Sequence, residues 1–89
     1  MSRAPVVIGR WYLRPDGSAR CPMRVDTREG WASVRYLQVM RRVATPRVQP
    51  AAESALRWWR WVRTAEIQEP GWWPEGIPRV DLAEYGVAP

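Results

Sequence analysis

VVIGRWYLRPDGSARCPMRV, residues 6–25, is the stretch that decides the fold we expect at the start of the chain. Apolar and polar residues alternate on both sides of a Pro-Asp-Gly turn, and a period of two is typical of strands with one buried face. The pattern predicts an antiparallel β-hairpin with strands at about residues 6–14 and 18–26. The side chains expected to point inward are Val7, Trp11, Leu13, Ala19, Cys21, Met23 and Val25.

The turn at residues 15–17 sets the register of this hairpin. A three-residue loop with its glycine in a left-handed conformation pairs Arg14 with Ser18 and places Leu13 opposite Ala19. A two-residue turn would instead place apolar side chains opposite arginines. We therefore expect the three-residue loop.

Two amphipathic helices are expected after the hairpin, at about residues 27–44 and 51–68. A strand over residues 31–40 is the alternative for the first of them. We favour the helix, because these residues do not alternate cleanly and one side of a helical wheel gathers Ala32, Tyr36, Val39, Met40 and Val43. The apolar stripe of the second helix consists of Ala51, Ala55, Trp58, Trp59, Val62 and Ala65.

The C-terminal part of the chain, residues 70–89, contains the segment PGWWPEGIP. Its prolines exclude a helix and disfavour a strand. We expect a strap that crosses the surface of a single small domain, residues 1–69, with Trp72 or Trp73 inserted into the core. The predicted class is therefore α+β, with a hairpin, two helices and a Pro/Trp-rich strap.

Positive charge is concentrated in the first half of the chain. Residues 1–48 hold ten arginines against three carboxylates, a local net charge of +7, whereas residues 49–89 have a net charge of −2. All 14 basic residues are arginine, which makes planar bidentate contacts to phosphate or carboxylate. The absence of Lys, Asn and Phe also fits a GC-rich coding sequence that supplies arginine wherever a cation is needed.

The composition excludes several classes of site. There is no His and one Cys, so the usual nitrogen and sulfur ligands of a metal site are missing and no disulfide can form within the chain. Without His, neither a Ser–His nor a Cys–His catalytic pair can be assembled. We expect Cys21 to be a buried small hydrophobe. The chain is therefore predicted to be non-enzymatic, with no cofactor and no metal.

The apolar runs of the chain are short. None approaches the length of a transmembrane helix, and residues 1–13 lack the continuous apolar segment of a signal peptide. We therefore expect a cytoplasmic protein without membrane association. Self-association is left open.

The polar face of the predicted hairpin is the first candidate binding surface. A two-stranded ribbon fits the DNA major groove, and aromatic rings among arginines can stack on bases. The candidate nucleic-acid-binding residues are Arg10, Tyr12, Arg14, Arg20, Arg24, Arg35 and Arg42. The favoured function is a small basic nucleic-acid-binding protein, with DNA preferred to RNA. On this hypothesis, Arg14→Ala combined with Arg20→Ala weakens binding without lowering thermal stability.

Tryptophans outside the hairpin suggest the alternative function, because tryptophan often anchors protein interfaces. Trp61, Trp72 and Trp73 are the candidate interface residues, facing an acidic partner; packing within their own domain is the competing interpretation. This alternative is a non-enzymatic protein-interaction module. Examples are a phage-type inhibitor of a host protein and a minor structural subunit of a virion or nucleoprotein assembly.

Overall fold

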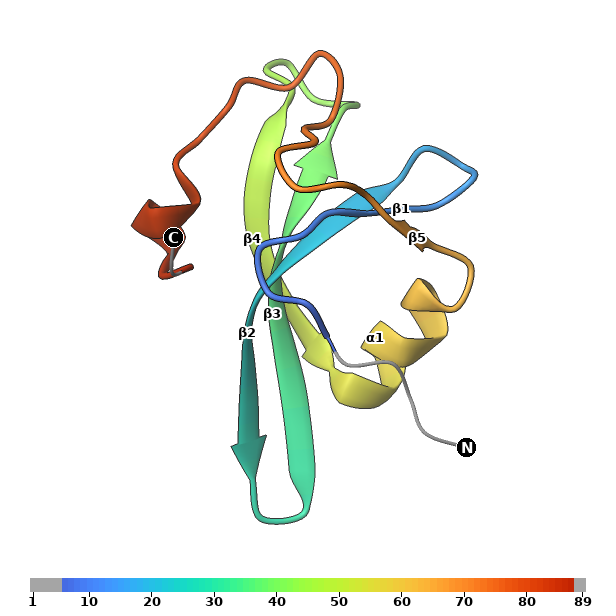
Figure 1. The fold of residues 1–89 in the computed structure, drawn as a ribbon, viewed down its shortest axis with the longest axis vertical. Helices are drawn as coiled ribbons and strands as arrows, with labels where there is room; N and C mark the ends of the chain where they lie inside the picture. The colour runs from blue at the N-terminus through green and yellow to red at the C-terminus, as the bar shows by residue number, and fades with distance from the viewer. Residues whose placement is uncertain (1–5, 88–89) are drawn as a thin grey trace.

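The computed structural model describes residues 6–87, which form a five-stranded antiparallel sheet, one α-helix and a long C-terminal segment (Figure 1). The sheet order is β4-β3-β2-β1-β5. Within this range no helix is long and apolar enough to cross a membrane. In chain order, the elements are β1 (Tyr12–Leu13), β2 (Ala19–Arg28), β3 (Trp31–Met40), β4 (Arg47–Ser54), α1 (Ala55–Val62), β5 (Glu66–Ile67) and the 3-10 helix η1 (Leu82–Tyr85).

The turn between β1 and β2 has the predicted register. The Arg14 amide donates to the Ser18 carbonyl at 2.9 Å, and Leu13 pairs with Ala19. The strand before the turn is much shorter than predicted, because Gly9 adopts a φ of +82° and turns the chain away just ahead of β1. The hairpin prediction is therefore right at the turn and wrong in the length of its first strand.

The prediction of a helix over residues 27–44 is wrong, because Trp31–Met40 forms the strand β3. This strand pairs with β2 on one side and β4 on the other. A strand covered on both faces need not alternate between apolar and polar residues. Val34 and Tyr36 pack with α1, whereas Leu37 and Val39 belong to the core beneath the C-terminal segment. The apparent helical stripe is thus divided between two faces of one sheet.

The second predicted helix, at residues 51–68, is also corrected. Residues 51–54 continue β4, and α1 begins at Ala55, where the Ser54 hydroxyl accepts a hydrogen bond from the Arg57 amide at 3.3 Å. The helix ends at Val62, and the chain then returns to pair β5 with β1. The fold is therefore mostly antiparallel sheet, and among residues 6–87 there is one α-helix of eight residues in place of the two predicted.

The two faces of the sheet have separate cores. On one face, the C-terminal segment contributes Ile77 and Val87 to a cluster with Trp11, Ala19, Cys21, Met23, Leu37 and Val48. On the other face, α1 places Trp58, which is 1% exposed, against Val34 and Tyr36. The sheet is therefore enclosed by α1 on one side and by the C-terminal segment on the other.

A β-bulge in β2 changes which side chains share a face. The register shifts between Pro22 and Arg24, so Met23 is the extra residue. Beyond the bulge, Arg24 lies opposite Arg35, and Val25 lies opposite Val34. The predicted alternation therefore fails at Val25, which is 42% exposed.

Candidate functional site

Around β1, the polar face of the β1–β2 hairpin is not an outer face of the molecule, because α1 packs over it and β5 pairs along the free edge of β1. The Arg10 side chain donates to the Gln68 carbonyl, just after β5. Tyr12 packs edge-on against Trp58, with ring centroids 5.8 Å apart. The side chains of Arg10 and Tyr12 are therefore packed within the molecule and do not form an open binding surface.

Among the predicted site residues, Arg20 makes the most contacts with other side chains of the fold. Its guanidinium donates to both carboxylate oxygens of Glu53, at 3.2 and 3.3 Å, and lies 4.4 Å from the ring centroid of Tyr36 and 4.5 Å from that of Trp61. The side chains of Arg20 and Glu53 are 16% and 23% exposed. Arg14 lies on the same indole, 5.6 Å from its centroid, and its Nε is buried. Both arginines are thus packed between the sheet and α1.

The tryptophans predicted to contact a partner also lie in or against the core. Trp61 is 9% exposed and packs on Trp58 at a centroid distance of 5.8 Å. Trp72 and Trp73 are partly buried and approach Trp11 edge-on, at 6.2 and 5.3 Å. The competing interpretation, packing within the domain, describes these contacts.

The bulge at Met23 brings together two predicted arginines that stay exposed. Arg24 on β2 and Arg35 on β3 are directly opposite each other, and their side chains are 68% and 62% exposed. The Asp26 carboxylate lies between them, 2.5 Å from Arg24 Nε and 3.6 Å from Arg35 Nε. Like charges directly opposite each other destabilise a sheet. One carboxylate offsets only part of the positive charge of two guanidiniums.

Two residues nearer the turn of the β2–β3 hairpin complete this surface, and neither was predicted as a site residue. Arg28 pairs with Trp31, and its guanidinium lies 5.3 Å from the indole centroid. Trp31 is 50% exposed. Both residues flank the turn at residues 29–30, in which Gly30 has a φ of +84°. The available signal was a glycine between two extended runs; it belongs to the alternative of a strand over residues 31–40, against which the helix over residues 27–44 was favoured.

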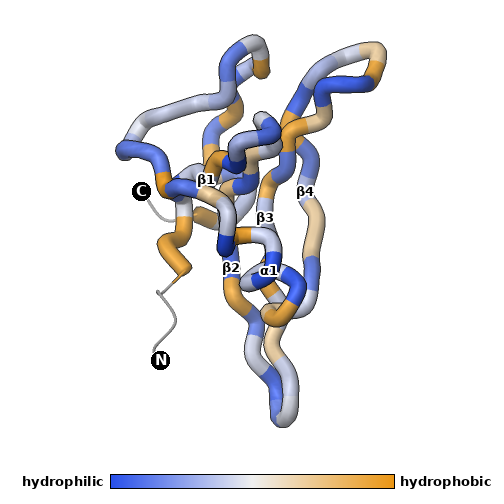
Figure 2. Tube along the Cα trace, turned by 90° about the vertical axis from the view of Figure 1, so that its right-hand side faces the viewer, coloured by the Kyte–Doolittle hydropathy of each residue, from blue (hydrophilic) through white to orange (hydrophobic). Residues whose placement is uncertain are grey.

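These side chains define one surface, which we call the arm face: Arg24, Asp26, Arg28, Trp31 and Arg35. A hollow of about 380 Å³ lies over it, bounded also by Thr27, Ser33 and Ala52. The β2–β3 hairpin extends away from the rest of the molecule, and its turn is hydrophilic (Figures 1 and 2). The arm face is therefore accessible to a large ligand.

A second hollow adjoins the arm face. It has a volume of about 360 Å³ and is lined by Met23, Pro50, Tyr85 and Gly86 together with Arg24 and Arg35. Arg24 and Arg35 therefore line both hollows and lie at the boundary between them. A ligand that follows β2 can pass from one hollow to the other along them.

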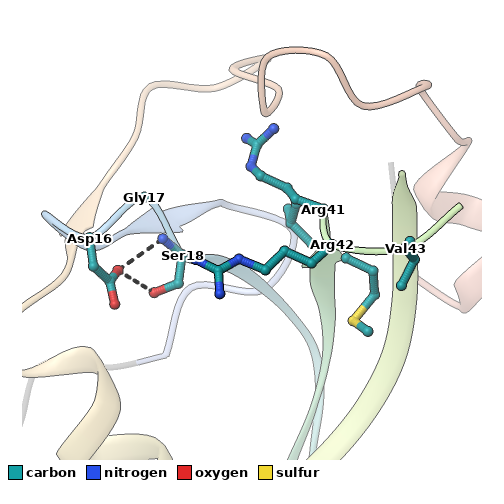
Figure 3. Close-up of a pocket in the computed structure, with 8 residues that line it drawn as sticks. Asp16, Gly17, Ser18, Arg41, Arg42 and Val43 are labelled. Atoms are coloured by element: carbon teal, nitrogen blue, oxygen red, sulfur yellow. Dashed lines mark hydrogen bonds between the residues drawn. The ribbon is translucent and has the colours of Figure 1, made fainter. Parts of the chain in front are cut away.

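Arg42 lies at the other end of β3. Figure 3 shows it reaching from the loop after β3 toward Ser18, in a hollow of about 440 Å³ next to the turn at residues 15–17. Arg35 lies five residues before the end of β3, roughly 17 Å at about 3.3 Å per residue, and Arg42 lies beyond that end. The structure therefore does not bring Arg42 to the arm face.

Cys21 is fully buried on the sheet face beneath the C-terminal segment. Burial raises the pKa of its thiol to about 12. The thiolate is the nucleophilic form of cysteine, so Cys21 is inert near neutral pH.

Comparison with protein-family models, with curated proteins and with solved structures finds no match for this chain. Among residues 6–87, no group of three or more Cys, Asp or Glu side chains is arranged to hold a metal ion. The arm face is the candidate site that combines exposed positive charge with an exposed aromatic ring.

Proposed function

We propose that the protein binds nucleic acid through the arm face. The observation that supports this is the opposed pair Arg24 and Arg35, both more than 60% exposed, beside the half-exposed indole of Trp31. Guanidinium groups make bidentate hydrogen bonds to phosphate, and an exposed indole offers a π-face to a base. The hairpin that binds is thus β2–β3, in place of the β1–β2 hairpin indicated by the sequence.

The charge of the arm face favours a polyanionic ligand. Three arginines oppose the carboxylate of Asp26, and the whole chain has a net charge of +5. A ligand phosphate relieves the repulsion between Arg24 and Arg35 that one carboxylate leaves uncompensated. If three phosphates are neutralised, a plot of log Kd against log salt concentration has a slope of magnitude about 2 for a single strand.

An acidic protein is the second candidate partner. The observation that favours it is the contact of the Asp26 carboxylate with both Arg24 and Arg35, because it shows that this surface accommodates a carboxylate. An acidic partner would replace Asp26 with its own side chains. Binding of poly-glutamate, with no binding of any nucleic acid at low salt, would favour this candidate over the proposed function.

The proposed function is tested by replacing the two opposed arginines. We expect Arg24→Gln with Arg35→Gln to weaken binding of labelled oligonucleotides at least about tenfold, because two charge-assisted contacts are lost. The salt slope should also fall in magnitude by about 1.4 on a single strand. Fluorescence anisotropy across a salt series measures both quantities.

A matched control removes the same charge from another part of the molecule. Arg57→Gln with Arg60→Gln changes two exposed arginines of α1, which lies on the opposite face of the sheet. This variant should retain most of the affinity. Equal weakening of the two double variants would contradict a specific role for the arm face and indicate a general effect of net charge.

A further inference from the structure

Trp31 differs from every other tryptophan of the chain. All seven lie within residues 6–87, and the other six are buried or partly buried, whereas Trp31 is 50% exposed. β4 ends opposite Ser33, so β3 has no further strand beside Trp31 on that side. Tryptophan is highly buried on average, and exposing half of it costs hydrophobic stabilisation. The fold therefore presents a flat aromatic surface at the end of the hairpin that core packing does not explain.

The distance from Trp31 to the opposed arginines suits a short length of nucleic-acid chain. Four residues of strand separate Trp31 from Arg35, roughly 13 Å. The hollow of about 380 Å³ lies between them, within the usual range of about 300–1,000 Å³ for pockets that accept small ligands. A base on Trp31 and the phosphates that follow it can therefore contact the ring and both guanidiniums at once.

The same geometry is unfavourable for a duplex. Paired bases in a duplex are stacked on one another, so an indole cannot reach their faces without unstacking them. Inserting the hairpin into a groove would also bring Glu29, in its turn, and Asp26 close to two lines of phosphates. An unpaired strand avoids both costs, since its bases are free to stack and its backbone can follow the arginines.

We infer that the ligand of the arm face is single-stranded nucleic acid, with one base stacked on the indole of Trp31 and adjacent phosphates bound by Arg24 and Arg35. This inference rests on the proposed function and specifies the kind of nucleic acid. Arg28, which already lies against the indole, is placed to contact the phosphate next to the stacked base.

The experiment uses the full chain and a fluorescein-labelled oligothymidine of about 12 nucleotides, with a duplex of the same length as the comparison. We expect the single strand to bind more tightly. Trp31→Ala should weaken binding of the single strand about 5- to 150-fold, as expected for the loss of one base–aromatic stack. Trp31→Phe should retain most of the affinity and lose the quenching of tryptophan fluorescence that accompanies binding.

Leu56→Ala is the matched control, because Leu56 is another large apolar side chain, 52% exposed, at the start of α1. Its affinity should equal that of the unmodified protein. Unchanged affinity in Trp31→Ala, together with weakening in the Arg24/Arg35 variant, would overturn the stacking inference and leave the proposed function standing. Tighter binding of the duplex would overturn it as well. If neither Trp31→Ala nor the Arg24/Arg35 variant weakens binding, the arm face is not the binding site and the proposed function fails as well.

Discussion

Arg20 and Arg24, four residues apart on β2, show how differently two arginines of one strand are used. Arg20 is stacked between Tyr36 and Trp61 and bonded to Glu53, whereas the Arg24 side chain is 68% exposed. Both contribute equally to the charge of the sequence. What separates them is the bulge at Met23, which places Arg24 on the sheet face opposite the one where α1 covers Arg20.

Loss of Arg20 should therefore lower stability. We expect Arg20→Ala to reduce the free energy of unfolding by about 2–4 kcal/mol, because it removes two cation–π contacts and leaves the Glu53 carboxylate partly buried without its ion pair. Urea denaturation followed by tryptophan fluorescence measures the change. Arg24→Ala is the control and should change it by no more than about 0.5 kcal/mol.

This expectation replaces the hypothesis that Arg14→Ala with Arg20→Ala leaves thermal stability unchanged. The hypothesis assumed a solvated face, whereas both guanidiniums lie against the indole of Trp61. Equal stability of the Arg20 and Arg24 variants would contradict the packing of Arg20 against Tyr36, Trp61 and Glu53.

β3 and the C-terminal segment are held in place mainly by tertiary contacts. Both depend on partners that are distant in sequence: β3 on β2 and β4, and the segment on the sheet face around Trp11 and Leu37. The segment has little regular structure beyond the four residues of η1. Its contribution is therefore tertiary, through side chains such as Ile77 and Val87 that complete one of the two cores.

Removal of this segment should prevent cooperative folding. A chain ending at residue 69 would expose Trp11, Cys21 and Leu37, which are 0–3% exposed in the full chain. We expect it to lose near-ultraviolet circular dichroism and the cooperative thermal transition. Ile77→Ala provides a graded comparison and should cost about 2–5 kcal/mol. A shortened chain that unfolds cooperatively at the original temperature would contradict this role of the segment.

The molecule as a whole has two cores, and each contains a titratable group whose pKa is raised by burial. The pKa of Cys21, beneath the C-terminal segment, rises from 9.0 to about 12. The pKa of Tyr36, beneath α1, rises from 10.0 to about 12, because burial and the nearby Glu53 outweigh the opposing effect of Arg20. Alkaline pH therefore acts on both faces of the sheet.

Stability should fall as the pH rises from about 9 to about 12. In this window the unfolded chain releases the protons of Cys21 and Tyr36, whereas the folded protein retains them. The free energy of unfolding is therefore unaffected below pH 9 and decreases above it. The decrease is up to about 1.4 kcal/mol per pH unit for each group. Thermal unfolding from pH 7 to 11 measures the decline. Cys21→Ala should remove the part that begins near pH 9, and Tyr36→Phe the part that begins near pH 10. A melting temperature that stays constant to pH 11 would refute the prediction.

The candidate site could be predicted only in part. Arg24 and Arg35 were identified as charged residues, but their pairing depends on the bulge at Met23, which reverses the alternation in the middle of β2. Arg28 and Trp31 were missed because the hairpin turn at Gly30 was assigned to a helix. A bulge and a second hairpin are set by pairing between strands, which the local sequence does not record.

The turn at residues 15–17, the pairing of Leu13 with Ala19 and the inward positions from Trp11 to Met23 follow from local pattern, because turn chemistry and a period of two are local properties. The strand at residues 31–40 and the positions of Arg14 and Arg20 beneath α1 depend instead on contacts between elements that are distant in sequence. Alternation shows only which side chains avoid water on one face of a strand. It does not show what covers the opposite face, and a strand buried on both faces loses the alternation altogether.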